Sequence, residues 1–575
     1  MNSKKYKDSL YPVRMIKDLR ELIYSSTDIF KNKPAFLVKG SHGGEYQPVS
    51  YDTMLDEMNS LGASLIDRGL GGEKIAIVAE NSYEWVLSYL AVCCGVGIFV
   101  PIERELTPED ISSLLARSSA KAIIYSDKTE ELVEEAIRGL NTDIKKVSID
   151  SKKHEADVIS FSQLLKEGRA LMQNGDKRYQ EAAIDEEAMS LLLFTSGTTG
   201  TAKGVMLSHK NLVSNVMNMS KYVNVNGFVG LSVLPMHHTY EMTCHILTSI
   251  YQGCTVAVCE GLKYIAKNMA EAKVNVMLGV PLIFETIYKR IERQSEKSGK
   301  AKKLKKGIAL SKKLHLYNTG VPKKIFKEIH NAVGGNVKLL VSGAAAMDPD
   351  IIENFCAMGI PMIQGYGMTE CSPIIAVNRD RYSKAASAGT ALPNTEIRIF
   401  EADENGIGEI VCRSDSVMLG YYNDPDETQK VLKDGWLYTG DYGYLDGDGF
   451  LYITGRKKNV IVTKNGKNIF PEEVEFHLGK SGYIKESLVY GVDEQCGGET
   501  AVHANIVPDY EVIEEEFGSI STHEVRKLIK EAVEQANSRM TQYKRVKRFE
   551  IRETEFEKTA SKKIKRNKAN RHEGN

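Results

Sequence analysis

A short polar loop between two apolar runs carries the clearest chemical signal in the sequence. The apolar run 191–194 leads into segment 195–204, which holds three glycines, five hydroxyl side chains and a lysine. Glycines let the backbone turn tightly and approach a ligand, and successive main-chain N–H groups in such a turn bind anions. The loop therefore predicts a polyphosphate site. The alternative is a Thr/Gly-rich hairpin without a ligand.

The spacing of this loop excludes the commonest polyphosphate-binding motif. A Walker A loop has Gly-x-x-x-x-Gly-Lys followed by Ser or Thr, whose hydroxyl holds magnesium. Counted from Gly197, the sixth position is Ala202, and Lys203 is followed by Gly204. Because no hydroxyl stands where the metal ligand is needed, we expect a different mode of polyphosphate binding.

Further groups of glycine, aromatic and charged residues follow downstream. Segment 364–370 places a tyrosine between glycines, where its ring can lie against a base, and ends in a carboxylate that can hold a divalent cation beside phosphates. Asp441 in Thr-Gly-Asp and Arg456 in Gly-Arg-Lys-Lys suit ribose hydroxyls and a phosphate. A glycine turn at 464–468 and a basic tail at 558–566 complete the set. Each group alone also fits a purely structural role.

The elements that must position these groups are predicted to alternate between strand and helix. Apolar runs predict strands at 74–79, 98–101, 122–125, 230–235, 255–259, 274–278 and 338–343, with helices such as 51–68, 82–94 and 130–140 between them. This βαβα order predicts a largely parallel sheet with ligands at the strand ends. Residues 151–185 are expected to form a polar connection. Short strands with turn signals from about residue 388 predict a small β-subdomain, and an α+β unit with helices at 471–478 and 523–536 closes the chain.

Length and composition indicate a multidomain globular protein. At 575 residues the chain exceeds one compact core, and its net charge of −1 lacks the basic excess of a nucleic-acid binder. The nine cysteines include no Cys-x-x-Cys pair, which favours reduced thiols in a cytoplasmic protein. The uncharged stretch 85–102 is interrupted by two glycines and a proline, so we expect a buried helix and a strand there rather than a membrane span. The N-terminus contains no apolar region typical of a secretory signal.

In their order along one chain, these motifs resemble the adenylate-forming superfamily of acyl-CoA synthetases, adenylation domains and luciferases, from about residue 30 to 566. The resemblance implies an α/β fold with a large N-terminal domain, built from two α/β sheets and a small β-subdomain at 1–457. A small mobile α+β domain at 458–575 would carry the adenylation lysine. The implied reaction uses ATP and Mg²⁺ to convert a carboxylate into an acyl-adenylate with release of pyrophosphate. The thiol of the cosubstrate coenzyme A then takes the acyl group, and AMP leaves.

The resemblance also implies a role for each matching residue. Glu370, assisted by Thr195, corresponds to the magnesium ligand, and Lys563 to the lysine that bridges the carboxylate and the α-phosphate. Lys458 corresponds to the hinge, and Gly466 to the loop beside the thiol's pantetheine arm. The expected ATP- and AMP-binding residues are Thr195, Ser196, Gly197, Thr198, Thr199, Gly200, Lys203, Gly343, Ala344, Tyr366, Gly367, Met368, Thr369, Asp441 and Arg456.

Two departures from the family pattern bear on these assignments. The family tail reads Pro-Lys-Thr-x-Ser-Gly-Lys, whereas Glu557 replaces the proline here and Lys562 the glycine, so Lys562 and Lys563 compete for the adenylation role. The register favours Lys563. The hinge residue is lysine where many relatives carry aspartate, which resembles the long-chain acyl-CoA synthetase branch.

The sequence gives weaker evidence about the acyl substrate. His237 and Tyr240 correspond to the segment beside the acyl pocket, although a histidine packed under the active site explains His237 equally well. The insertion 290–316 resembles the long-chain branch and favours a medium- to long-chain fatty acid. The basic run at 289–313 is either a solvated helix pair or a patch that touches anionic lipid or an acidic carrier.

The predicted function is therefore an AMP-forming fatty acid–CoA ligase, cytoplasmic or peripheral at the inner face of the membrane. An acyl-acyl carrier protein synthetase is the nearest alternative, because the adenylation chemistry is the same and only the thiol acceptor differs. The alternative from another functional class is a non-catalytic acyl or nucleotide sensor. The sequence retains every expected polar residue, which argues for an enzyme instead.

Overall fold

The computed structural model describes residues 9–40, 43–140, 143–150, 157–195, 202–317, 319–463, 467–493, 500–558 and 564–566. The chain divides into two compact units. The first unit comprises Met1–Glu396, Cys412–Leu437 and Gly449–Leu451, and the second comprises Ile397–Val411, Tyr438–Asp448 and Tyr452–Asn575. The domain boundary expected at residues 457–458 stays a prediction.

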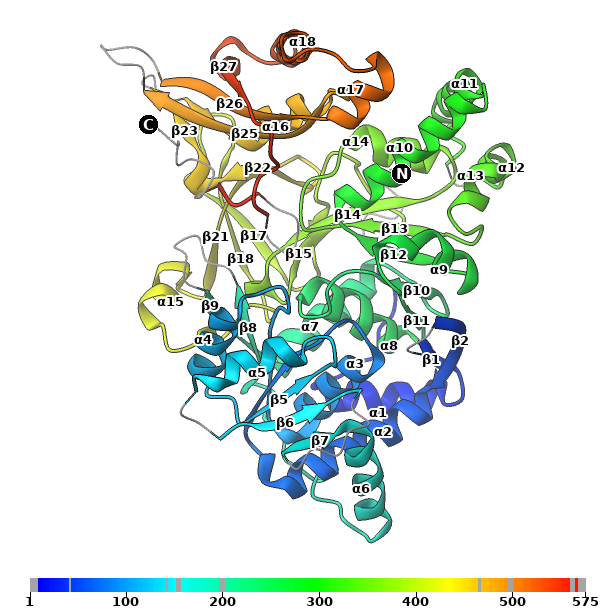
Figure 1. Ribbon diagram of the computed structural model, residues 1–575, viewed down its shortest axis with the longest axis vertical. Helices are drawn as coiled ribbons and strands as arrows, with labels where there is room; N and C mark the ends of the chain where they lie inside the picture. Colours follow the sequence, from blue (N-terminus) through cyan, green and yellow to red (C-terminus); the bar gives the residue numbers. More distant parts are fainter. Residues whose placement is uncertain are drawn as a thin grey trace. The chain divides into compact units, whose positions relative to one another are not determined.

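Two large sheets organise the first unit (Figure 1). The nine-stranded sheet runs in the order β16 (Thr390–Ala391), β15 (Ile374–Val377), β14 (Met362–Gly367), β13 (Leu339–Ser342), β12 (Val276–Gly279), β10 (Val229–Ser232), β11 (Thr255–Val258), β1 (Pro34–Gly40) and β2 (Gly43–Ser50). Its strands from β14 to β1 are parallel, and antiparallel strands lie at both ends. The predicted strands at 230–235, 255–259, 274–278 and 338–343 therefore become neighbours in one sheet.

The second sheet contains the strands on both sides of the predicted polyphosphate loop. It runs in the order β19 (Gly420–Tyr421), β9 (Lys203–Ser208), β8 (Met189–Thr195), β4 (Ile98–Pro101), β3 (Lys74–Val78), β5 (Ala122–Tyr125), β6 (Lys145–Ser148) and β7 (Val158–Ser160). Strands β8 and β9 form an antiparallel hairpin, and β19 adds to its far side. A strand from more than 200 residues downstream thus lies beside the predicted polyphosphate loop.

Several local predictions are confirmed. Helix α2 (Tyr51–Leu65) begins at Ser50, whose side chain accepts a hydrogen bond from the Thr53 N–H. The uncharged stretch forms helix α3 (Tyr83–Ala91), a π-helical turn and β4, and no described helix is long and apolar enough to cross a membrane. The basic run forms two helices, α10 (Pro281–Lys297) and α11 (Ala301–Lys313).

The segment expected to be a polar connection is partly structured, so that expectation is wrong for residues 158–173. Strand β7 and helix α6 (Phe161–Gln173) occupy it. Helix α6 packs on α2 at Gly168, where an added Cβ would lie 1.7 Å from the Ser60 carbonyl oxygen. The backbones of the two helices are therefore in contact at this point. The polar composition of the segment gives no indication of this tertiary interaction.

The second unit combines the predicted β-subdomain strands with an α+β part. Strands β17 (Glu396–Phe400), β18 (Gly408–Arg413) and β21 (Trp436–Leu445) lie in this order, and β22 (Leu451–Arg456) pairs with β21. Helices α16 (Pro471–Gly479) and α18 (Thr522–Ser538) confirm the predicted C-terminal helices, beside the sheet of β25 (Ile484–Asp493), β26 (Thr500–Pro508) and β27 (Val546–Ile551). The α/β class with a large N-terminal and a smaller C-terminal domain is thus confirmed.

Candidate active site

The β8–β9 hairpin places the two ends of the predicted polyphosphate loop side by side. Thr195 and Lys203 are directly opposite each other, and the Thr195 hydroxyl lies 3.5 Å from the Lys203 carbonyl oxygen, which accepts its hydrogen bond. The strand–loop–strand arrangement is therefore as predicted. The assignments of Ser196, Gly197, Thr198, Thr199 and Gly200 lie outside the described residues.

Lys203 is held by residues that the sequence analysis did not select. Its ammonium group forms an ion pair with Glu427 of helix α15 (Pro425–Val431) and lies 4.9 Å from the centre of the Tyr421 ring. This ion pair, with a second one from Lys430, lowers the pKa of Glu427 to about 2. The carboxylate is thus ionised at neutral pH, and its negative charge faces the Lys203 ammonium group.

Tyr421 connects this lysine to the predicted metal ligand. The register of β19 places Tyr421 opposite Val205 of β9, and the Tyr421 hydroxyl donates a hydrogen bond of 2.9 Å to Glu370 Oε1. The Met418 N–H donates to the Glu370 carbonyl oxygen at 2.9 Å. Burial, and next the charge of Glu370, raise the pKa of Tyr421 well above its ordinary value, so the phenol keeps its proton. A chain of contacts therefore runs from Glu427 through Lys203 and Tyr421 to Glu370.

The only local signal for these missed residues is the Asp-Pro pair at 424–425, which begins a helix and places Glu427 in its first turn. Nothing in segment 418–427 itself indicates that it lies against β9. That contact depends on strand pairing between distant segments.

The predicted adenine-site residues lie at the ends of two neighbouring parallel strands. Ser342 of β13 is opposite Gln364 of β14, so Gly343 and Ala344 follow one strand while Tyr366 and Gly367 end the next. Gly367 must be glycine, because an added Cβ would lie 1.9 Å from the Pro373 carbonyl oxygen. Met368 and Thr369 continue directly toward Glu370. These residues share one edge of the sheet, as expected for a ligand site in an open α/β sheet.

Tyr240, an expected acyl-pocket residue, lies against this same edge. Its hydroxyl donates to the Val341 carbonyl oxygen at 3.0 Å, and an added Cβ on Gly343 would lie 2.6 Å from Tyr240 Cζ. Tyr240 opens the π-helical segment η4 (Tyr240–Leu247). One expected acyl-pocket residue and one expected adenine-site residue are therefore in direct contact.

His237 is a partly buried neutral imidazole. Its ring centre is 4.2 Å from that of His238, and burial, followed by the neighbouring His238, lowers its pKa well below the ordinary value. Its Nε2 has no hydrogen-bond partner among the described residues. An uncharged, unsatisfied ring nitrogen is compatible with a pocket wall, and its acyl-pocket role stays a prediction.

In the second unit, the predicted ribose-binding residues contact each other. Arg456 Nε lies 2.7 Å from Asp441 Oδ1, and the Asp441 carboxylate is buried whereas Arg456 is half exposed. The adjacent β21 and β22 bring the two residues together. Lys458, the predicted hinge, follows in a 3₁₀ turn, where burial and next the charges of Arg456 and Arg566 lower its pKa. Gly466, Lys562 and Lys563 lie outside the described residues.

Glu370 suits a magnesium ion that arrives with a nucleotide. Among the described residues no group of three or more His, Cys, Asp or Glu side chains could hold a metal by itself. Magnesium is commonly bound by one or two carboxylates together with substrate phosphates, and the Tyr421 hydrogen bond occupies only one oxygen of Glu370. The donor set fits Mg²⁺ bound jointly with ATP.

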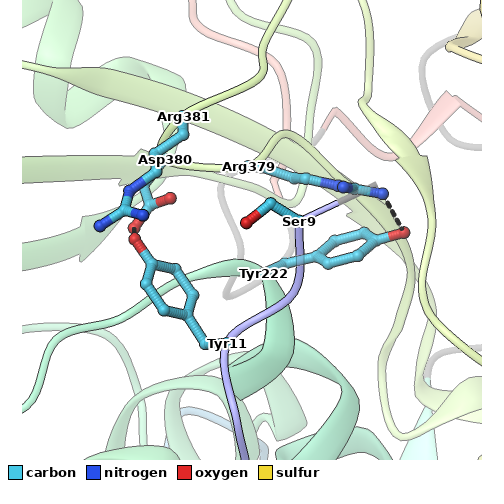
Figure 2. Close-up of a pocket in the computed structure, with 6 residues that line it drawn as sticks. All are labelled: Ser9, Tyr11, Tyr222, Arg379, Asp380 and Arg381. Carbon is cyan, nitrogen blue, oxygen red and sulfur yellow. Dashed lines mark hydrogen bonds between the residues drawn. The ribbon is translucent and has the colours of Figure 1, made fainter. Parts of the chain in front are cut away.

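A separate small pocket, shown in Figure 2, contains none of the predicted site residues. It is lined by Ser9, Tyr11, Tyr222, Arg379, Asp380 and Arg381. The Tyr11 hydroxyl donates to Asp380 at 2.9 Å, and the Arg379 guanidinium donates to the Tyr222 hydroxyl at 3.0 Å. These contacts attach the segment around Tyr11 to the chain that follows β15.

Comparison with known families identifies the chain. The model of AMP-binding enzymes matches residues 26–422, and that of the AMP-binding enzyme C-terminal domain matches residues 458–572. The chain belongs to the AMP-binding enzyme family. The resemblance to adenylate-forming enzymes found in the sequence is thereby confirmed, and the chain is an enzyme of this family.

Known relatives of this AMP-binding enzyme include two plant ligases. A peroxisomal long chain acyl-CoA synthetase 7 of Arabidopsis thaliana is 28% identical over 481 residues, covering 78% of this chain and 67% of the relative. A chloroplastic long-chain fatty acid–[acyl-carrier-protein] ligase of the same plant is 26% identical over 513 residues, covering 76% of this chain and 69% of the relative.

A solved structure supports the fold of this AMP-binding enzyme. The anthranilate CoA ligase AuaEII in complex with anthranoyl-AMP superposes with a TM-score of 0.76 at 20% identity, covering 97% of each chain. At this identity the likeness shows the fold alone.

Proposed function

We propose that this AMP-binding enzyme is an AMP-forming ligase that joins a medium- to long-chain fatty acid to coenzyme A. The observation that supports the proposal is the contact chain from Lys203 through Tyr421 to Glu370, which connects the predicted phosphate-loop lysine to the predicted magnesium ligand. A curated relative is named a long chain acyl-CoA synthetase, which agrees with this substrate class.

The proposed reaction gives each part of the site a chemical role. A carboxylate oxygen of the fatty acid attacks the α-phosphorus of ATP, and pyrophosphate leaves to give the acyl-adenylate. Lys203 and the hydroxyls and N–H groups of the 195–204 loop would hold the departing phosphates. Mg²⁺, held by Glu370 with Thr195 assisting, would neutralise charge that grows on the phosphate oxygens.

The remaining predicted residues would complete the nucleotide site and take part in the second step of the reaction. Gly343, Ala344 and the Tyr366–Thr369 segment would bind adenine, and Asp441 with Arg456 the ribose, so their mutual ion pair would be exchanged for contacts with the sugar. Lys563 would bridge the substrate carboxylate and the α-phosphate. In the second step the thiolate attacks the acyl carbon and AMP leaves, with Lys458 as the hinge and Gly466 beside the pantetheine arm.

The acyl chain would lie beside Tyr240 and His237. Tyr240 contacts Gly343, so a fatty acid carboxyl group at this position would lie close to the bound nucleotide. Both side chains are uncharged at neutral pH, because burial raises the pKa of Tyr240 and lowers that of His237. A neutral wall suits an alkyl chain.

A carrier-protein thiol is the second candidate acceptor, because one relative is named a long-chain fatty acid–[acyl-carrier-protein] ligase. Incubation with ATP, Mg²⁺ and a panel of carboxylic acids of increasing chain length, first with coenzyme A and then with holo-acyl carrier protein, separates the two. We expect acyl-CoA from medium- and long-chain acids. If acyl-carrier protein alone forms, the acceptor assignment is wrong, and the absence of pyrophosphate release with every fatty acid contradicts the substrate class.

The proposed place of action is the cytoplasm, with peripheral contact to the inner face of the membrane. A fatty acid partitions into lipid, so an enzyme that uses it gains from contact with the bilayer surface. Fractionation of the native protein between soluble and membrane pellets at low and high salt tests this location.

A further inference from the structure

Helix α11 and the short helix α12 (Val321–Ile325) lie in an unusually basic segment that ends at the first residue of α13 (Lys327–Ala332). Residues 300–327 contain ten lysines and no aspartate or glutamate. Helix α10, in contrast, interleaves its basic residues with Glu285, Glu292 and Glu296. Figure 1 shows the four helices grouped in green beside β12, β13 and β14. The structure thus divides the basic run 289–313 into a mixed helix and a purely cationic one.

Helix α11 exposes leucines among its lysines. Its buried face consists of Leu304, Ile308 and Ser311. On another face Leu310 and Leu314 are 50% and 55% exposed, one turn apart. Lys306 and Lys313 are exposed and lie three or four residues from Leu310, so their side chains flank it on the helix surface.

Helix α12 extends this apolar surface. An added Cβ on Gly307 of α11 would lie 3.0 Å from Phe326 Cζ and 3.9 Å from Ile325 Cγ2, so the end of α12 packs against the middle of α11. Val321 and Ile325, also one turn apart, are 45% and 53% exposed. Lys323 and Lys324 between them are exposed as well. Four large apolar side chains are therefore exposed to solvent close to exposed lysines. They are Leu310, Leu314, Val321 and Ile325.

Among the residues that the structure describes, only some of the lysines of this surface have a carboxylate partner. Lys300 pairs with Glu328, and Lys312 pairs with Glu353. Within residues 300–327 there is no carboxylate to neutralise the lysines that flank the leucines. A helix with exposed apolar side chains between cationic ones binds at the interface of anionic bilayers, where the apolar tips enter the acyl boundary and the lysines meet the headgroups.

We propose that the surface formed by Lys306, Leu310, Lys313, Leu314, Val321 and Ile325, here called the lysine–leucine face, docks on a bilayer that contains anionic lipid. An acidic protein would also satisfy the lysines. The bilayer is favoured because each exposed large apolar side chain of this surface lies within two residues of a lysine. Lipid headgroups can therefore meet the lysines while acyl chains meet the apolar side chains. This docking rests on the membrane contact proposed above and specifies the surface that makes it. It needs neither nucleotide nor substrate, so its failure is distinguishable from a failure of the proposed chemistry.

Flotation of the full-length protein with vesicles tests the proposal. The vesicles are neutral phosphatidylcholine or phosphatidylcholine with phosphatidylglycerol, at low and at high salt. We expect binding to the anionic vesicles only, weakened by salt. Because each lysine near such a surface contributes about a factor of five, Lys306→Glu/Lys313→Glu should weaken binding by at least roughly 25-fold. Leu310→Ser/Leu314→Ser should weaken it by roughly tenfold at unchanged charge.

Matched controls keep the result interpretable. Lys166→Glu/Lys177→Glu makes the same charge change at exposed lysines elsewhere in the first unit, and Ile29→Ser/Leu262→Ser removes exposed apolar side chains there. These controls should bind like the wild type, and all variants should keep wild-type pyrophosphate release with a micelle-free substrate. Equal losses in controls and test variants, or binding to a holo-carrier protein without binding to anionic vesicles, would overturn the proposal.

Discussion

Lys203 and Glu370 are the charged residues on which the candidate site depends, and neither is isolated. Lys203 is neutralised by Glu427, and Glu370 accepts a hydrogen bond from the Tyr421 hydroxyl. ATP phosphates would therefore compete with Glu427 for the lysine, while Tyr421 would keep the carboxylate oriented for a metal ion. Both supporting residues can be tested without removing the charged groups themselves.

Tyr421→Phe removes the hydrogen bond to Glu370 and leaves the ring below Lys203. A hydrogen bond to a charged group contributes about 1.5–3 kcal/mol, so we expect the rate of adenylation to fall roughly tenfold or more. ATP–pyrophosphate exchange measures this step alone. Tyr422→Phe, at the next position, is the control and should leave the rate unchanged. An unaltered rate in Tyr421→Phe would show that Glu370 is oriented by other contacts.

Glu427→Gln should release Lys203 for the phosphates. The pKa of Glu427, about 2, lies below the ordinary value of 4.5, so its ion pair is fully formed above pH 4.5 and is lost only as the pH falls toward 2. At assay pH the carboxylate therefore always competes with ATP. We expect the KM for ATP to fall roughly threefold, as for one exposed ion pair. Asp426→Asn in the same helix is the control, and a higher KM in Glu427→Gln would indicate that the pair positions Lys203.

At the scale of elements, strand pairing decides which residues meet. Strand β19 joins β9 and brings Tyr421 to the hairpin, while the parallel pair β13–β14 brings Gly343 and Tyr366 to one edge. Close helix packing has the same kind of effect away from the site. At Gly168, helix α6 touches the backbone of α2, and this contact supports the sheet that carries the hairpin.

Gly168→Ala should separate these two helices. The added methyl group would lie 1.7 Å from the Ser60 carbonyl oxygen, and backbone on both sides must move to accept it. We expect the free energy of unfolding of the first unit to fall by about 3 kcal/mol. Thermal and urea unfolding measure the change. Gly139→Ala, where an added Cβ meets nothing within 4 Å, serves as the control, and equal stability of the two variants would contradict close packing of α2 and α6.

At the scale of the whole molecule, the proposed chemistry draws on both compact units. The described residues of the predicted phosphate, adenine and acyl sites belong to the first unit, whereas Asp441, Arg456 and Lys458 belong to the second. A reaction with two half-reactions can use this division, because a residue of the second unit can serve one step and be dispensable in the other.

Lys563→Ala should lower adenylate formation by roughly 10²–10³-fold, because it removes a positive charge that stabilises the developing charge at the α-phosphate. Transfer from supplied acyl-adenylate to coenzyme A should stay close to wild type. ATP–pyrophosphate exchange and single-turnover thiolysis measure the two steps separately. Lys562→Ala is the matched control. If it loses adenylation while Lys563→Ala keeps it, the register assigned to the tail is wrong.

By itself the sequence determined the fold class, the two strands on either side of the predicted polyphosphate loop, most of the helices and the family. These features are encoded in short contiguous stretches, as glycine and hydroxyl clusters, apolar periodicity and helix-capping residues. The expectation of a polar connection is wrong at 158–173, because α6 is recognisable only through its packing on α2.

Only the tertiary structure decided which residues support the predicted ones. Glu427 lies 224 residues from Lys203, and Tyr421 lies 51 residues from Glu370. No local pattern specifies such pairs, because they depend on the order and register of strands, which many sequence segments could satisfy equally well. The surface formed by the exposed leucines of α11 also depends on tertiary structure. Its composition follows from which face of α11 is buried and from where α12 packs, and neither is specified by a local pattern.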